Sequence, residues 1–526
     1  MYFCLELNIF GKATLPLKSL NLIRIIILNY KAIHILKTFS KDDVKQFKNF
    51  LNSPFFNTSN TLTRLYNSLI VFYPCFNSKF LSEEKLFKKV NPGRNFNKST
   101  IKNLFADLAA ASEKYFMHIN FRNREIESYD FLRDEMFKRH LEKYLYDNIK
   151  KSELLLEKEI NHDGNYFLNR MRLLTDKLNY QIINQPRANN SIISSNVDLF
   201  EERAKYITYY FVKEMIREYD NILTMGKTFR IDSEKSFVHK LFGKVNFEDL
   251  LNFLVQNSTN KKTGGIFEVY QSLLLAFSRF ENEKHYYRYK KLLSQNIKYC
   301  GVNEIRFHTG RLIRYCINKC AIDNSREKFE KELFSVYIFV LSNKFYKSSI
   351  SSFMPVELYR TILQFGLKMK KYKWIYEFIN EYKSTLHPDR RKNMYNYSCA
   401  KYFFHRGRYG EAMKSFHKVE LNHFMLKLDL KNLMLMTFYE LNMYENAISL
   451  IDTYNHFLSN DKTLSTLEKR KHKNFVNIVQ KMIAYKTFSN PIIKFDIEKG
   501  LENDLPEKEW VIEKMVELEK QYYKSA

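Results

Sequence analysis

The sequence predicts an all-α protein. The chain has 526 residues but only 13 glycines and 9 prolines, about 4% of positions against roughly 12% in an average protein. Sandwiches, propellers and glycine-rich nucleotide folds need more of these turn-forming residues. From Lys31 onward, apolar residues recur at helical spacing between short polar loops, and no alternating pattern is long enough for a sheet. The length exceeds that of a usual single domain, so more than one packing unit is expected.

Residues 1–30 are predicted to be a poorly ordered extension or the product of an upstream start codon. The apolar run between Leu20 and Leu28 contains Arg24 and is far shorter than the roughly 20 residues that a membrane-spanning helix needs. No small-residue cleavage site of a signal peptide follows it. We therefore expect no membrane span and a fold that begins near Lys31.

Residues 31–120 are predicted to form a helical N-terminal module. Ser40 precedes two acidic residues, Asp42 and Asp43, which is typical of a capped helix start because the helix dipole favours acids there. Further helices are expected at residues 62–72, 82–90 and 97–116. Residues 121–262 are predicted to be long connecting helices, for example at residues 129–160, 166–183 and 197–223.

The last third of the chain contains an internal repeat. One set of residues recurs 35 positions later, and a weaker set precedes it by 37. The three sets begin at Leu363, Ala400 and Leu435. This pattern resembles a degenerate tetratricopeptide repeat, a two-helix unit of about 34 residues. It departs from the family pattern at those three positions, where a small glycine is usual. The resemblance implies a superhelix of stacked helix pairs over residues 263–488, followed by a C-terminal capping helix over residues 489–526.

Small and aromatic residues of the two clearest repeats are predicted to pack between stacked helices, because a two-helix unit cannot bury both of its faces alone. They are Phe403, Tyr409, Ala412, Phe416, Phe438, Tyr444, Ala447 and Ile451. The whole chain also resembles a group of uncharacterised bacterial helical proteins that begin with a segment like residues 39–57 and end with such repeats. That resemblance implies a shared fold and a bacterial cytoplasmic origin, and it implies no activity.

The sequence lacks the motifs of the common nucleotide-binding, hydrolase and zinc-peptidase families. Cys316 and Cys320 are four residues apart, with His308 and Cys300 nearby, and soft ligands at this spacing can share a metal. No second close pair completes the set, so we interpret these cysteines as core residues. We therefore expect a protein that is not an enzyme and that has no catalytic, cofactor or metal site. Six cysteines without regular spacing favour a reducing, cytoplasmic location.

The chain is strongly basic, with 85 Lys and Arg against 58 Asp and Glu and a net charge of +27. Such a balance can attract nucleic acid, anionic membranes or acidic proteins. The charge is also spread along the whole chain, which a codon composition rich in A and T would explain. Two clusters provide candidate anion or partner contacts: Lys368, Lys370, Lys371 and Lys373 in one, and Lys290 and Lys291 in the other.

These observations predict a non-enzymatic helical-repeat scaffold that binds a protein or peptide partner, with acidic partners favoured by the charge. The alternative is a nucleic-acid-binding protein that uses the basic clusters and a helix-turn-helix-like element at residues 82–116. In that element, Lys98 and Lys102 lie at the start of the second helix, where phosphates would bind. Its turn is longer than the three or four residues of a standard motif.

Overall fold

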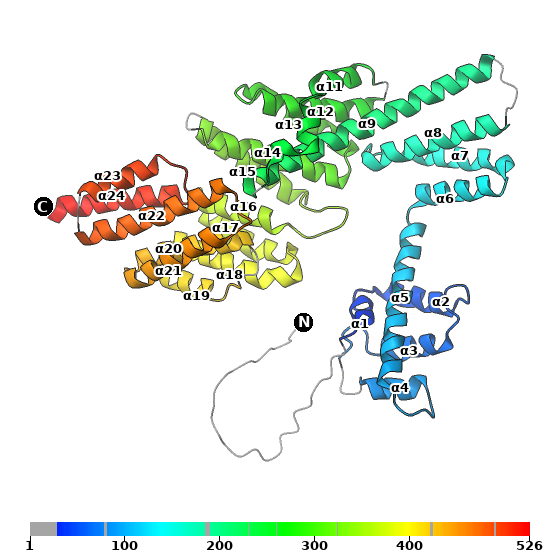
Figure 1. Ribbon diagram of the computed structural model, residues 1–526, viewed down its shortest axis with the longest axis horizontal. Coiled ribbons are helices and arrows are strands. Elements are labelled where there is room, and N and C mark those ends of the chain that lie inside the picture. Colours follow the sequence, from blue (N-terminus) through cyan, green and yellow to red (C-terminus); the bar gives the residue numbers. More distant parts are fainter. Residues whose placement is uncertain are drawn as a thin grey trace. The chain divides into compact units, whose positions relative to one another are not determined.

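The computed structural model describes residues 29–77, 81–184, 190–229, 231–258, 260–322, 325–420, 424–488 and 491–525. These residues form α-helices and no strand, which confirms the predicted all-α class (Figure 1). Residues 1–28 of the predicted extension lie outside the described residues, and α1 begins at Lys31. Within the described ranges, every helix is too short or too polar to cross a lipid bilayer.

Contacts divide the chain into two compact units, Met1–Asn148 and Ile149–Ala526. The first unit contains six helices and the beginning of a seventh: α1 (Lys31–Leu36), α2 (Lys41–Asn52), α3 (Asn60–Ile70), α4 (Glu83–Val90), α5 (Lys98–Arg122), α6 (Glu125–Lys138) and α7 (Glu142–Lys158). Ser40 starts α2 with a capping box, in which its hydroxyl accepts from the Asp43 N–H and Asp43 accepts from the Ser40 N–H.

The prediction of a single long helix at residues 129–160 is wrong, because α6 and α7 are separate helices. His140 adopts the left-handed conformation with φ 55°. The N–H of Leu141 then donates to the carbonyl of Met136 at 2.9 Å, which satisfies a carbonyl at the end of α6. The helical periodicity continues through this break, so the sequence pattern alone did not reveal it.

The second unit contains the remaining helices. Two long ones open it, α8 (Gly164–Asn184) and α9 (Asn190–Thr228). The helices that follow are α10 (Phe237–Phe242), α11 (Phe247–Gln256), α12 (Lys261–Ser278), α13 (Glu283–Asn296), α14 (Val302–Cys320), α15 (Arg326–Ser342), α16 (Val356–Lys368), α17 (Tyr372–Tyr382), α18 (Pro388–His405), α19 (Tyr409–Phe416), α20 (Phe424–Glu440), α21 (Tyr444–Asn460), α22 (Thr466–Phe488), α23 (Pro491–Leu501) and α24 (Lys508–Ser525).

Successive helices of the second unit pack as antiparallel pairs, among them α16 with α17, α18 with α19, and α20 with α21 (Figure 1). The first helices of these pairs also contact one another in order, from α16 to α18, α20 and α22. Among the residues predicted to pack between helices, Ala412, Phe416, Phe438, Ala447 and Ile451 are buried. The other three, Phe403, Tyr409 and Tyr444, are half-buried.

The turns between paired helices repeat in the same register as the sequence pattern. Lys370, Gly407 and Asn442 each adopt a positive φ, of 52°, 70° and 57° respectively. In each turn, the next residue donates its N–H to a carbonyl in the last turn of the first helix, at 2.9 to 3.0 Å. This bonding closes each first helix at the same point and starts the second one at a similar angle.

The C-terminal region forms two helices, α23 and α24, where one capping helix was predicted. Pro506 has no N–H to donate, and Glu507 has a φ of 56°, so the chain cannot continue as a helix through residues 502–507. The resulting connection crosses the first helices of the preceding pairs.

Candidate functional site

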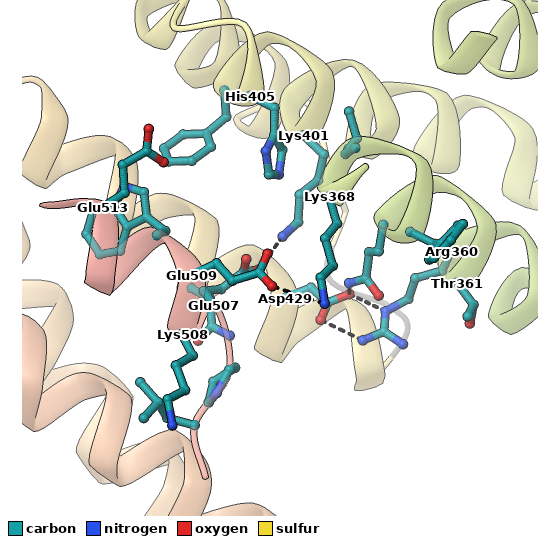
Figure 2. A pocket seen from close by; sticks show the side chains of 18 of the residues that line it. Arg360, Thr361, Lys368, Lys401, His405, Asp429, Glu507, Lys508, Glu509 and Glu513 are labelled. Atoms are coloured by element: carbon teal, nitrogen blue, oxygen red, sulfur yellow. Dashed lines mark hydrogen bonds and ion pairs between the residues drawn. The ribbon is translucent and has the colours of Figure 1, made fainter. Parts of the chain in front are cut away.

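A cavity of about 1010 Å³ lies in the second unit, between the first helices of successive pairs and α24. We call its helical wall the groove. The polar part of this wall comes from α16, α18, α20 and α22, with these residues: Arg360, Gln364, Lys368, Lys401, His405, Asp429, Asn432, Glu440, Glu468, Lys471 and His472. Figure 2 shows several of these side chains converging on the cavity opposite the residues at the start of α24.

Asp429 is the buried centre of a polar network at one side of the groove. Its carboxylate accepts two hydrogen bonds from the Arg360 guanidinium, one of them at 2.7 Å, and one from the Tyr397 hydroxyl at 2.8 Å. The Gln364 amide donates a further one at 3.1 Å. Burial alone would raise the pKa of Asp429, but Arg360 and its other donors hold that pKa below the ordinary value. The carboxylate therefore stays charged and joins α16, α18 and α20.

Lys401 and Glu507 form a second ion pair, which joins α18 to the C-terminal connection. The Nζ–Oε1 distance is 2.6 Å, and the Lys401 side chain is only 2% exposed (Figure 2). Burial by itself would raise the pKa of Glu507, whereas the ammonium of Lys401 lowers it below the usual range. The Glu507 carboxylate is therefore charged at neutral pH.

Two histidines of the groove are neutral at neutral pH. Burial, reinforced by nearby cations, lowers the pKa of His405 to about 4. Burial also lowers the pKa of His472 to about 4, and its Nδ1 lies 2.8 Å from the Tyr454 hydroxyl. The positive charge of the groove therefore comes from its lysines and arginine.

Residues 504–510, which we call the C-terminal segment, bring acidic groups to this wall. Without the residues from 504 onward, the lining of the cavity holds five cations, which are Lys370 of the turn after α16 together with Arg360, Lys368, Lys401 and Lys471, and three acids, which are Asp429, Glu440 and Glu468. Asp504 pairs with Lys471 at 2.7 Å, and Glu509 pairs with Lys368 at 3.1 Å and also with Arg326. The C-terminal segment thus meets the excess positive charge of the groove.

The structure separates the lysines predicted from the sequence. Lys368 and Lys370 line the cavity, whereas Lys371 and Lys373 are exposed outside its lining. The Lys371 ammonium lies 4.7 Å from the centre of the Phe334 ring. In the other cluster, Lys290 pairs with Glu332 at 2.6 Å and Lys291 is exposed, and neither lines the cavity.

Arg360, Lys401 and Lys471 were not among the predicted contacts. Arg360 and Lys401 have no basic neighbour in the sequence, and Lys471 lies in the basic run of residues 469–473, where spacing alone does not show which cation lines a cavity. The repeat register contains a signal for such positions. Five residues after each repeat's first position lie Lys368, His405 and Glu440, all of which line the cavity. One residue after the first position, Gln364 and Lys401 also line it. Comparing polar residues across the register would have identified this wall.

The cysteines considered as metal ligands lie elsewhere in the second unit. Cys300 and Cys316 are buried, and burial raises the pKa of the Cys316 thiol to about 12. Its Sγ lies 3.2 Å from the Tyr286 hydroxyl, and His308 is bonded through Nδ1 to Tyr289 at 2.8 Å. In the part of the chain that the structure describes, no three potential metal ligands gather at one point.

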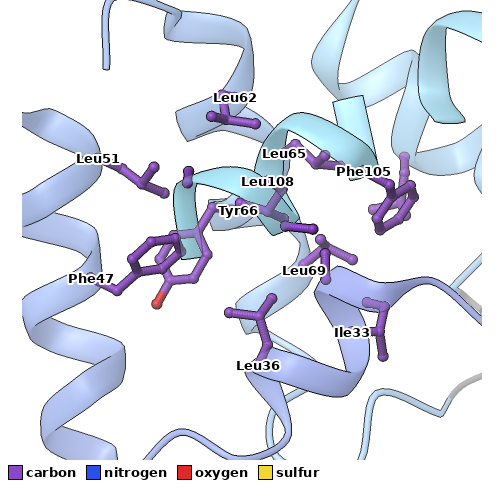
Figure 3. Packing of buried hydrophobic residues seen from close by; sticks show 14 of the residues in the cluster. Ile33, Leu36, Phe47, Leu51, Leu62, Leu65, Tyr66, Leu69, Phe105 and Leu108 are labelled. Atoms are coloured by element: carbon purple, nitrogen blue, oxygen red, sulfur yellow. The ribbon is translucent and has the colours of Figure 1, made fainter. Parts of the chain in front are cut away.

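The helix-turn-helix-like element of the first unit presents a basic corner. The element packs on the hydrophobic core of the first unit. Phe47, Tyr66 and Phe105 belong to this core, which Figure 3 shows between α1, α2, α3 and α5. Cations of α4, the turn after it and the start of α5 are exposed above this core: Lys85, Lys88, Lys89, Arg94, Lys98 and Lys102. Asn97 caps α5 by accepting from the Thr100 N–H at 2.9 Å.

Comparison of the chain with protein-family models, with curated protein sequences and with solved structures gave no match. What is established is a helical protein with many packed helix pairs, an arrangement compatible with helical repeats.

Proposed function

We propose that this protein is a non-enzymatic scaffold whose C-terminal helix pairs form a tetratricopeptide-like superhelix that binds an acidic, extended segment of a partner protein. The groove is the binding surface. The cavity that it lines has a volume of about 1010 Å³, at the upper end of the range of roughly 300–1,000 Å³ that is usual for ligand pockets.

The observation that carries this proposal is the charge of the groove. Its cations exceed its acids, and the buried acid Asp429 is already neutralised by Arg360. Lys368, Lys401 and Lys471 are therefore the groups that carboxylates of a ligand would meet. Gln364 and Tyr397 also donate hydrogen bonds to Asp429, an arrangement that fixes the shape of the wall.

Fluorescence anisotropy with labelled peptides of equal length tests this proposal. A peptide rich in Glu and Leu should bind, and a peptide rich in Lys and Leu should not. Lys370→Glu, which changes a lining residue, should weaken the acidic peptide about three- to tenfold because it replaces an attraction by a repulsion. Lys373→Glu is the matched control, since Lys373 is exposed outside the lining. Equal binding of both peptides, or equal effects of both variants, would contradict the proposal.

A second candidate function is nucleic-acid binding by the basic corner of the first unit. The observation that favours it is the exposure of six cations on α4, the following turn and the start of α5. Binding through these cations should weaken with salt, with a log–log slope of about −0.9 per duplex phosphate contacted. Joint replacement of Lys88, Lys98 and Lys102 by Glu should abolish duplex binding. Unchanged binding by this variant would exclude the corner as the site.

A further inference from the structure

The C-terminal segment already occupies the positions where an acidic partner would bind. Each of its three carboxylates pairs with a lysine from a different helix of the groove: Asp504 with Lys471 of α22, Glu507 with Lys401 of α18, and Glu509 with Lys368 of α16. The pairs extend along the first helices of successive repeats, which is how a separate extended peptide would be held.

Apolar contacts fix the same segment between its charges. Leu505 is 6% exposed and Trp510 is 9% exposed. The Trp510 indole N–H donates to Glu440 at 2.7 Å, so the ring is anchored at both its apolar face and its polar edge. The segment therefore combines charge complementarity with a buried aromatic anchor, the two elements that usually dominate peptide recognition.

We propose that residues 504–510 are an internal ligand of the groove, and that the partner presents the same chemistry, with carboxylates at positions i, i+3 and i+5 followed by an aromatic residue. This proposal rests on the function proposed above. The internal ligand and the partner require the same lysines, so they compete. Only molecules in which the internal ligand is undocked can bind the partner. The apparent affinity for the partner therefore falls in proportion to this undocked fraction.

Glu507 is the residue whose loss should release the C-terminal segment most. Its partner Lys401 is 2% exposed, and the Glu507 side chain is 22% exposed. Asp504 and Glu509 are 71% and 50% exposed, so water screens their pairs. Replacing Glu507 by Gln leaves Lys401 buried without a counter-charge in the docked state, which favours undocking. The free Lys401 then gains by pairing with a carboxylate supplied by another molecule.

The test uses the full chain and a labelled peptide with the sequence of residues 502–512, in which Phe replaces Trp510. Glu507→Gln should bind this peptide about tenfold more tightly than the wild type because a larger fraction of the groove is free. Glu502→Gln is the matched control: it makes the same chemical change at an exposed position outside the lining and should leave the affinity unchanged. A peptide with amides in place of its carboxylates should bind neither protein.

Displacement is measured separately by the emission of Trp510. The chain has two tryptophans, so Trp374→Phe leaves Trp510 as the sole reporter. Saturating peptide should shift its emission to longer wavelength as the indole leaves its buried position. Joint replacement of Asp504 by Asn and Glu509 by Gln removes the other two carboxylates of the segment and provides a second release variant, should Glu507→Gln fail to fold.

The outcomes distinguish the two proposals. If the wild type and the release variants bind the acidic peptide equally, or if saturating peptide leaves the Trp510 emission unchanged, the internal ligand is refuted while the binding function stands. If no variant binds any acidic peptide, the proposed function itself fails, and the internal ligand fails with it.

Discussion

Replacement of Gly407 by Ala isolates the contribution of one repeat turn to stability. Gly407 has a φ of 70°, and a Cβ added there would meet no atom within 4 Å, so backbone strain is the only native-state cost. An L-residue in this conformation costs roughly 1–2 kcal/mol. The alanine also lowers the conformational entropy of the unfolded chain, which stabilises the fold by roughly 0.4–1 kcal/mol. We therefore expect Gly407→Ala to lower the free energy of unfolding by about 1 kcal/mol.

Gly410 provides the internal control, because it lies three residues later within α19 and has equally open surroundings. Its backbone is helical and not left-handed, so Gly410→Ala should raise the free energy of unfolding by about 0.5 kcal/mol. Urea unfolding followed by tryptophan fluorescence is the assay, since Trp374 and Trp510 both lie in the second unit. Shifts of the same sign and size in the two variants would refute the assigned turn conformation and the register built on it.

Further predictions concern packing, buried charge, pH and thiol reactivity. Ala412→Leu should destabilise the fold by about 1–3 kcal/mol through overpacking, seen as a lower melting temperature; an unchanged one would mean that this alanine is not at a packed position. Asp429→Asn should cost about 3–5 kcal/mol in urea unfolding because it leaves the Arg360 guanidinium, which is only 19% exposed, without its counter-charge. Glu327→Gln at an exposed pair should leave the unfolding midpoint nearly unchanged, and equal shifts in the two variants would contradict the network. The pKa of His472 is about 4 in the fold against 6.5 ordinarily, so the unfolded chain binds the proton first as the pH drops. The free energy of unfolding should therefore fall between about pH 6.5 and 4, and a free energy of unfolding that does not change over this range would contradict the prediction. Cys316, with its pKa raised to about 12, should react with a thiol reagent at pH 8 only after denaturation, and rapid modification of the native chain at this residue would show that it is accessible.

The fold class could be predicted because helical periodicity and the scarcity of glycine and proline are local properties of the sequence. The repeat register was also visible, since Ala412 and Ala447 recur at a fixed separation, and both are fully buried. The break at His140 was missed, because a left-handed residue other than glycine leaves the apolar pattern undisturbed. The basic clusters were visible too, but only Lys368 and Lys370 of those predicted line the groove.

The sequence by itself determined that this chain forms helices and that its last third pairs them, because each helix carries an apolar face that only a neighbour can bury. Tertiary structure alone decided which charges meet. Lys401 and Glu507 are more than a hundred positions apart in the chain, and their ion pair exists only because the stacked first helices align Lys368, Lys401 and Lys471 along one wall. An acidic segment that looks like an ordinary polar connection in the sequence becomes a bound ligand when it crosses that wall, since Coulomb attraction depends on distance in space and not along the chain.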